Sequence, residues 1–215
     1  MSNAYLTLSQ VDMTFESKGG GTNPVLRTIQ TLQGELPLML HPDPKAVLQI
    51  GFGSGGTYAT LNELRPPGMT IEVLELTPEV IKASERWLRD VNRGTLSASS
   101  DRVTINDARS HMIGSGRTYD LILSDSIHPR FRGNASLYSR DYFELCDRRL
   151  RPGGLFSTWL PLYGMSVDDL KGIFASLRAV FPHVQIWYPN GEPNENTVLV
   201  GSMEPIRVDA ARFRR

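Results

Sequence analysis

A glycine-rich turn directly after a short apolar strand constrains this sequence more than any other feature. The strand covers residues 46–50, and Gly51-Phe52-Gly53-Ser54-Gly55-Gly56 follows it. Glycine takes positive φ angles and lets a bound group approach the backbone closely. The helix expected to start near Gly55 presents unpaired N–H groups at the same place. The pattern therefore predicts a strand, a tight turn and a helix that together hold a polar group of a ligand.

An acid ends the next predicted strand, residues 70–75, at Glu75. In nucleotide-binding βαβ units, an acid about 20 residues after the glycine turn accepts hydrogen bonds from ribose hydroxyls. The alternative is an ordinary solvated acid at the end of a strand. The order and spacing of the two signals together favour nucleoside binding.

Short apolar strands alternate with helices along the rest of the chain. Further strands are predicted at 102–105, 119–124, 155–160, 184–188 and 197–201, and helices at 24–40, 58–64, 78–91, 137–150 and 166–180. Thr77 is expected to cap its helix through its side chain, and residues 151–154 are expected to form a turn. The alternation indicates an α/β fold with a doubly wound, mostly parallel sheet, and the last two strands form an antiparallel C-terminal edge.

The length of 215 residues suits one domain with small additions. We expect a short extension with a strand or hairpin at 1–23, a nucleoside-binding domain at 24–204 and a basic tail at 205–215. The 23 basic and 23 acidic side chains balance, so no global field favours nucleic acid or an acidic membrane. The single cysteine, Cys146, fits a reducing compartment and a buried position on a helix.

Acids also follow two other predicted strands, at Asp107 and Asp125. Ligands of open α/β sheets bind outside the carboxyl ends of the strands, so these acids join the glycine turn and Glu75 as site candidates. Asp107 has an alternative role as the cap of the helix that follows it. Capping explains Asp125 less well, because Ser126 and a proline-containing loop follow it instead of a helix.

No motif in the sequence indicates a metal or a phosphate loop of the Gly-x-x-x-x-Gly-Lys type. The four histidines are dispersed, and no Cys/His cluster or His-Glu-x-x-His motif occurs. No apolar run approaches the roughly 18 residues of a membrane span, and the N-terminus lacks a signal-peptide pattern. We therefore expect a cytoplasmic chain with no membrane or nucleic-acid partner and no metal.

Five successive segments carry a resemblance to a known family. They are Ile-Gly-Phe-Gly-Ser-Gly-Gly-Thr at 50–57, Leu-Glu-Leu at 74–76, Asn-Asp-Ala at 106–108, Leu-Ser-Asp-Ser at 123–126 and Arg-Pro-Gly-Gly-Leu-Phe at 151–156. They resemble the spermidine synthase (polyamine aminopropyltransferase) family, and the likeness covers residues 28–201. Segments 36–45 and 159–164 are most similar to a bacterial spermidine-synthase-like branch whose members are often fused to membrane segments.

The resemblance implies a Rossmann-like, S-adenosylmethionine-dependent methyltransferase fold and decarboxylated S-adenosylmethionine as donor of an aminopropyl group to a small amine. It implies that Asp125 is the catalytic base, and it assigns donor contacts and acceptor contacts to two further groups of residues. The donor contacts are Gln30, Gly51, Gly53, Ser54, Gly55, Glu75 (ribose) and Asp107 (adenine), and the acceptor contacts are Ser126, His128 and Tyr163. Packing is the alternative role for Tyr163, and a homodimer is left open.

The sequence departs from the family at three places. Ser54 stands where the family has an acid, and His128 stands where it has a second acid three residues after the base. Arg130 and Arg132 enter the same loop, and cations there oppose binding of a polycation. We therefore expect discrimination against long polyamines. An S-adenosylmethionine-dependent methyltransferase and a non-catalytic nucleoside-binding or assembly module of the same fold are the alternatives.

Overall fold

The computed structural model describes residues 24–125, 128–131, 133–189 and 196–209, with the backbone alone for 24–28. The strand or hairpin expected within residues 1–23 lies outside the described residues, as does most of the tail. Residues 205–209 form neither helix nor strand. The domain boundaries stay predictions.

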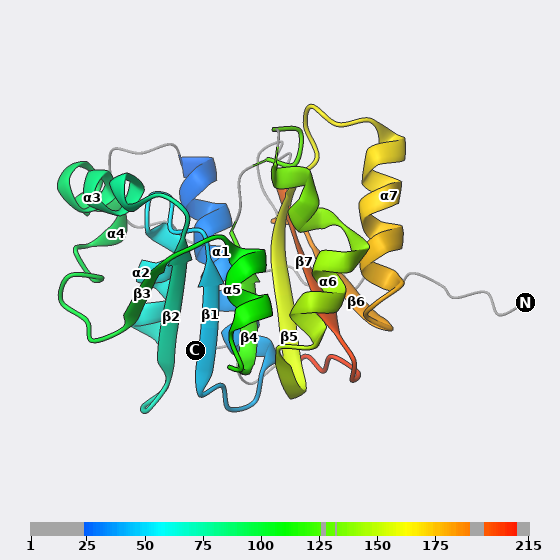
Figure 1. Cartoon of the computed structure of the whole chain (residues 1–215), viewed down its shortest axis with the longest axis horizontal. Coiled ribbons are helices and arrows are strands. Elements are labelled where there is room, and N and C mark those ends of the chain that lie inside the picture. Colours follow the sequence, from blue (N-terminus) through cyan, green and yellow to red (C-terminus); the bar gives the residue numbers. More distant parts are fainter. Residues whose placement is uncertain (1–23, 126–127, 132, 190–195, 210–215) are drawn as a thin grey trace, which may run out of the picture.

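Seven strands form one sheet in the order β3-β2-β1-β4-β5-β7-β6 (Figure 1). The strands are β1 Ala46–Ile50, β2 Thr70–Glu75, β3 Arg102–Ile105, β4 Tyr119–Ser124, β5 Leu150–Pro161, β6 His183–Trp187 and β7 Asn196–Ser202. The first five are parallel, whereas β7 runs antiparallel to both β5 and β6. This confirms the predicted doubly wound sheet with an antiparallel C-terminal edge.

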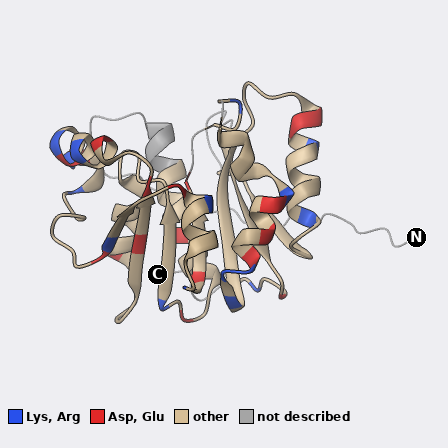
Figure 2. Ribbon diagram, in the orientation of Figure 1, with Lys and Arg blue, Asp and Glu red and all other residues tan. Residues whose placement is uncertain are grey.

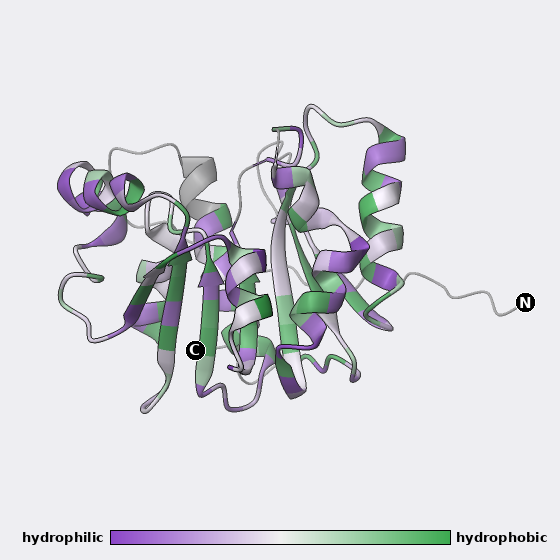
Figure 3. Cartoon of the chain, in the orientation of Figure 1, coloured by the Kyte–Doolittle hydropathy of each residue, from purple (hydrophilic) through white to green (hydrophobic). Residues whose placement is uncertain are grey.

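Helices cover both faces of the sheet. They are α1 Pro24–Leu40, α2 Gly56–Leu64, α3 Pro78–Trp87, α4 Arg89–Asn92, α5 Ala108–Gly114, α6 Arg140–Asp147 and α7 Val167–Arg178, with a 3-10 helix η1 at Asn134–Tyr138. Leu36 of α1 and Leu61 of α2 pack with Val47 on one face. Phe143 of α6 and Leu177 of α7 belong to the cluster on the other face. Figure 3 shows the strands of the sheet centre as mostly apolar ribbons, as burial on both faces requires.

Two predicted helices are interrupted in the structure. The predicted helix 78–91 is broken at Leu88, whose φ of −120° and ψ of 31° separate α3 from α4. Thr77 makes no side-chain capping bond, so that prediction was wrong. The predicted helix 137–150 is divided between η1 and α6, because the Ser139 side chain accepts a hydrogen bond from the Tyr142 amide and starts a new helix there.

The turn predicted at 151–154 lies inside strand β5. The strand already pairs with β4 at Leu150, and the pairing register shifts between Tyr119 and Leu121. Gly153, with a φ of 76°, absorbs this irregularity. A bulge and a turn share the same proline and glycine signals, which explains the wrong start of the strand.

Candidate functional site

The glycine turn after β1 has the backbone that its sequence predicts. Gly51, Gly53 and Gly55 have φ angles of 83°, 54° and 81°, a region that favours glycine. A Cβ atom added at Gly53 would meet nothing within 4 Å, so this part of the turn faces open space. A Cβ atom at Gly55 would lie 2.7 Å from Phe52 and Asn92. The turn is thus open on one side and tightly packed on the other.

Three helices fix this turn by polar contacts. From α1, the Gln30 side-chain amide donates to the Ser54 hydroxyl at 2.7 Å. From α3, the Ser84 hydroxyl donates to the Gly53 carbonyl. Asn92 of α4 donates to the Ser84 carbonyl at 2.9 Å and lies 3.4 Å from that of Ser54. Sequence reasoning selected Gln30 and Ser54 but missed Ser84 and Asn92, which no motif marks.

Glu75, at the end of β2, is oriented by backbone donors. One carboxylate oxygen accepts from the Phe52 amide at 3.0 Å, and the other accepts from the Thr77 amide at 3.1 Å. The side chain is only 9% exposed, so the alternative of a solvated strand-end acid was wrong. Each oxygen keeps a lone pair for a further donor, such as a ribose hydroxyl.

Asp107 has the capping role that was its alternative interpretation. Its carboxylate accepts from the Ser110 amide at 2.8 Å at the start of α5. The residue is exposed and follows β3, the neighbour of β2. A contact with adenine stays a prediction.

Asp125 follows the central strand β4 next to the glycine turn. Its amide donates to the Ile50 carbonyl at 2.8 Å, and its carboxylate accepts from the Thr57 hydroxyl at 2.7 Å. Thr57 is buried in the first turn of α2. Burial raises the pKa of Asp125 to about 6, although the Thr57 hydrogen bond acts in the opposite direction. Sequence reasoning did not assign this role to Thr57.

The peptide before Asp125 is held by two further side chains. The Ser124 carbonyl accepts from the Thr158 hydroxyl of β5 at 3.2 Å and from the Gln33 side-chain amide of α1 at 3.4 Å. Gln33 is almost fully buried, and its side-chain oxygen has no partner among the described residues. Gln33 was missed because it lies on an amphipathic helix without a motif.

His128 and Tyr163 form a pair beyond Asp125. The His128 ring is 4% exposed, so it does not point to solvent. Its Nδ1 atom accepts from the Arg130 amide at 3.1 Å, which leaves Nε2 to donate to the Tyr163 carbonyl at 2.8 Å. The Tyr163 ring packs against the His128 ring at 5.0 Å and is 42% exposed. Ser126 and Arg132 lie outside the described residues.

Polar contacts therefore join Gln30 to the turn, Glu75 to the turn and Asp125 to the helix after it. Among the described residues, no hydrogen bond or ion pair joins Asp107 or the His128–Tyr163 pair to Glu75, Asp125 or the glycine turn. Three or more metal-ligating side chains do not gather anywhere in the described part of the chain. Within the same residues, no helix is long and apolar enough to cross a membrane.

A family model described as the spermine/spermidine synthase domain matches residues 28–189. The chain belongs to this family. Among relatives, the polyamine aminopropyltransferase of Nitrosomonas europaea is 36% identical over 149 residues, which cover 68% of this chain and 44% of that protein. The spermidine synthase of Schizosaccharomyces pombe is 29% identical over 161 residues, 74% of this chain and 52% of that protein. The chain spans about half the length of these curated relatives.

Solved structures show the same fold. A spermidine synthase in complex with the transition-state analogue AdoDATO has a TM-score of 0.73 and 21% identity, covering 87% of this chain and 63% of that one. Human methyltransferase-like protein 13 in complex with SAH has a TM-score of 0.62 and 21% identity, covering 89% and 90%. The predicted Rossmann-like methyltransferase fold is confirmed.

Ser54 is one of the positions at which this chain differs from the pattern expected of the spermine/spermidine synthase family. At the position where an acid was expected from the family, the Ser54 hydroxyl accepts a hydrogen bond from Gln30. An uncharged side chain there leaves Glu75 as the acid that directly contacts the backbone of the glycine turn in the described residues. Glu75 is therefore the strongest candidate for a nucleoside contact.

Proposed function

We propose that this chain transfers an aminopropyl group from decarboxylated S-adenosylmethionine to a small amine, with Asp125 as the base. The observation that carries the proposal is the desolvated Asp125 carboxylate at the carboxyl end of β4, beside the glycine turn, with its pKa raised to about 6. Active-site carboxylates are tuned upward by burial in this way. Family membership supplies the reaction class.

The residues around the glycine turn fit the nucleoside part of such a donor. Glu75 is buried, oriented and still able to accept two hydrogen bonds from ribose hydroxyls. Gly53 leaves open space on the side of the turn where a ligand would approach. Gln30, Gly51, Ser54 and Gly55 would border the donor, and Asp107 would reach the adenine amine while still capping α5.

The proposed chemistry needs one proton acceptor. The amine must lose a proton to expose its lone pair, and Asp125 takes that proton as the nitrogen attacks the carbon beside the sulfonium. The N–C bond forms, the C–S bond breaks, and methylthioadenosine leaves as a neutral thioether. A base with a pKa of about 6 is ionised at neutral pH and is a stronger acceptor than an ordinary aspartate.

A methyltransferase is the second candidate, because human methyltransferase-like protein 13 has a similar fold. S-adenosylmethionine carries one carboxylate more than the decarboxylated donor. Calorimetry with each donor, followed by mass spectrometry of a diamine incubated with protein and donor, separates the two. We expect preference for the decarboxylated donor and an added aminopropyl group. An added methyl group would overturn the proposal, and binding without any product would favour the non-catalytic module.

The acceptor, the location and the assembly state belong to the same proposal. We propose a small amine as acceptor, with Ser126, His128 and Tyr163 on the acceptor side. A cytoplasmic location is supported by Cys146, which is a buried free cysteine as predicted. A homodimer is a further proposal, which light scattering after size-exclusion chromatography tests.

A further inference from the structure

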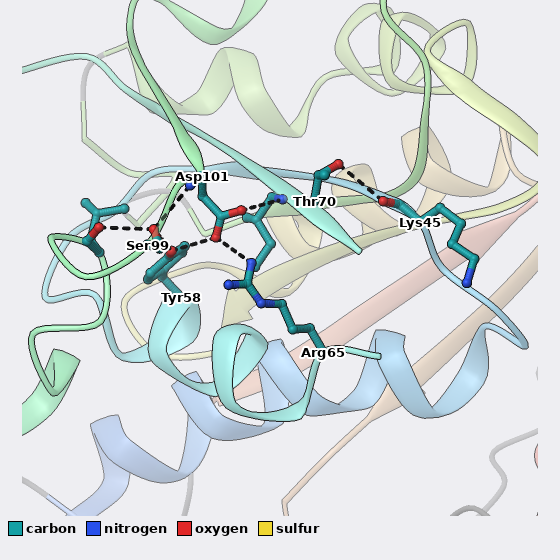
Figure 4. A network of polar contacts seen from close by, with 8 residues as sticks. Lys45, Tyr58, Arg65, Thr70, Ser99 and Asp101 are labelled. Carbon is teal, nitrogen blue, oxygen red and sulfur yellow. Dashed lines mark hydrogen bonds and ion pairs between the residues drawn. The ribbon is translucent and has the colours of Figure 1, made fainter. Parts of the chain in front are cut away.

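A large cavity lies at the amino-terminal ends of the parallel strands, opposite the end that carries the glycine turn. It has a volume of about 980 Å³, and it is lined by the amino-terminal ends of β1 to β4 and the segments before them. Because these four strands are parallel, their amino ends lie away from Glu75 and Asp125. Figure 4 shows part of its wall, where the Arg65 guanidinium points to the Asp101 carboxylate.

Arginine dominates the charge of this cavity. Arg65, Arg102, Arg117 and Arg151 line it, against the two acids Glu72 and Asp101. The whole chain has a formal net charge of zero, and Figure 2 shows basic and acidic residues interspersed over the ribbon. Ion pairs with Asp101, Glu72 and Asp120 offset three of the four arginines, so the local excess is the charge of Arg102.

Three of the arginines are held from behind by buried acids. Arg65 pairs with Asp101 at 2.7 Å, Arg117 with Glu72 at 2.9 Å and Arg151 with Asp120 at 3.0 Å. The acid side chains are 5%, 6% and 12% exposed, whereas those of the arginines are 27%, 48% and 41% exposed. The acids thus lie inside the protein, and the guanidinium groups extend toward solvent with N–H groups to spare.

The buried acids also accept hydrogen bonds from other groups of the protein. Asp101 also accepts from the Tyr58 hydroxyl at 2.7 Å and from the Ile71 amide at 3.1 Å (Figure 4). Burial disfavours ionisation of Glu72, but hydrogen bonds from Tyr119, Thr104 and Arg117 outweigh it and lower its pKa. The acids orient the arginines and leave little capacity to bind a cation in the cavity.

Arg102 differs from the other three arginines. It is exposed at the first residue of β3, and no hydrogen bond or ion pair engages its guanidinium in the part of the chain that the structure describes. A charged fork without an acceptor therefore faces a cavity whose other arginines are already oriented. Such a set matches the oxygens of a phosphate group, which arginine binds with two parallel hydrogen bonds.

We propose that this cavity is a second ligand site, which binds a phosphate-bearing anion through Arg102 together with Arg65, Arg117 and Arg151. The fixed arginines lose little conformational freedom on binding, which favours a specific site over a diffuse one. The site is separate from the proposed donor site and does not depend on the proposed function. A merely solvated arginine surface is the alternative that the experiment must exclude.

The test is calorimetric titration of the folded chain with sodium pyrophosphate, with orthophosphate as a second probe and sodium chloride at equal ionic strength as the blank. Arg102→Ala removes a side chain without partners, so its melting temperature should match that of the unmodified chain. We expect its affinity for pyrophosphate to fall at least fivefold, and Arg102→Lys to lose affinity too, because an ammonium lacks the planar fork.

Arg178→Ala is the matched control, since Arg178 is exposed near the end of α7 and does not line the cavity. It should bind pyrophosphate like the unmodified chain, and excess methylthioadenosine should not displace pyrophosphate. The proposal is overturned if the unmodified chain gives no heat beyond the chloride blank, or if Arg102→Ala loses less than fivefold. Equal losses in both alanine variants, or displacement by methylthioadenosine, would also overturn it.

Discussion

At the scale of single residues, the proposed site contains two acids, Glu75 and Asp125, with different surroundings. The Glu75 carboxylate accepts hydrogen bonds from two backbone amides. The Asp125 carboxylate accepts one from the Thr57 hydroxyl, and desolvation raises its pKa. Backbone donors fix the orientation of a carboxylate, while desolvation makes a carboxylate a better proton acceptor. The two acids are thereby suited to binding and to catalysis, respectively.

Glu75→Ala should weaken binding of methylthioadenosine by about 1 to 3 kcal/mol, because ribose hydroxyls lose a charged acceptor. Calorimetry on the folded variant measures the loss. Glu79→Ala is the control, as Glu79 is an exposed acid in the first turn of α3. Equal affinity of the Glu75 variant and the unmodified chain would remove Glu75 from the donor site.

Asp107→Ala separates the two roles of Asp107. Loss of the cap on α5 should lower stability by about 1 kcal/mol. If the carboxylate also contacts adenine, affinity for methylthioadenosine should fall in the same variant. A lower melting temperature with unchanged nucleoside binding would leave capping as the only role.

Asp125→Asn should change the pH dependence of stability in a stated direction. The pKa of Asp125 rises from an ordinary 3.8 to about 6 in the folded chain. The folded state therefore holds this proton more tightly, and its contribution to stability falls as pH rises through that window. In Asp125→Asn this pH-dependent loss of stability should be absent. The melting temperature of the variant, relative to that of the unmodified chain, should therefore be higher at pH 8 than at pH 4. Asp168→Asn, which changes an exposed residue, should show no such difference. The raised pKa would be contradicted if the melting temperatures of the unmodified chain and of Asp125→Asn changed equally with pH.

The sequence and the structure predict different effects of His128→Asp. From the sequence, an acid at this position should raise turnover of putrescine or spermidine. In the structure the ring is buried, and both of its nitrogens are hydrogen-bonded to backbone groups. An aspartate cannot donate to the Tyr163 carbonyl when ionised. We therefore expect a loss of stability of about 1 to 3 kcal/mol in urea melts, and a stable variant with raised diamine turnover would restore the first interpretation.

At the scale of elements, the glycine turn is held between β1, α2 and the α3–α4 pair. Gly55 and Gly68 have the same φ of 81°, but an added Cβ would touch Phe52 and Asn92 only at Gly55. Gly55→Ala and Gly68→Ala should both cost about 1 to 2 kcal/mol from the left-handed backbone. Gly55→Ala should cost about 1 to 3 kcal/mol more from overpacking. Urea melts give both values, and equal costs would mean that the turn is not tightly packed.

The sequence was informative where a local pattern decides the structure. The apolar runs predicted every strand of the sheet, and the glycines and Glu75 predicted the turn and its acid. The break at Leu88 was not predictable, because Asn92 and Ser84 divide the helix through contacts with the distant turn. The start of β5 was missed because a bulge at Gly153 has the sequence of a turn. The roles of Thr57 and Gln33 depend on the folded chain, which brings Thr57 to the Asp125 carboxylate and Gln33 to the Ser124 carbonyl.

At the scale of the whole molecule, the two ends of the parallel strands carry different kinds of side chain. The carboxyl-terminal ends of the strands bring together Glu75, Asp125 and an open glycine turn, which suits a nucleoside with hydrogen-bond donors. Arginines that are oriented by buried acids lie at the amino-terminal ends of the strands, and this arrangement suits an anion. The two proposed sites would therefore bind ligands of different chemistry at opposite ends of the same strands.

The most direct test of the central claim measures aminopropylation of putrescine by mass spectrometry, with decarboxylated S-adenosylmethionine as donor. Turnover by the unmodified chain should rise with pH through about 6, as Asp125 loses its proton. Asp125→Asn should lower turnover by about 10² or more, the usual contribution of a positioned base, and leave methylthioadenosine affinity within about threefold. Spermidine should react more slowly than putrescine. No aminopropylated product from any amine, or equal turnover by Asp125→Asn, would contradict the account.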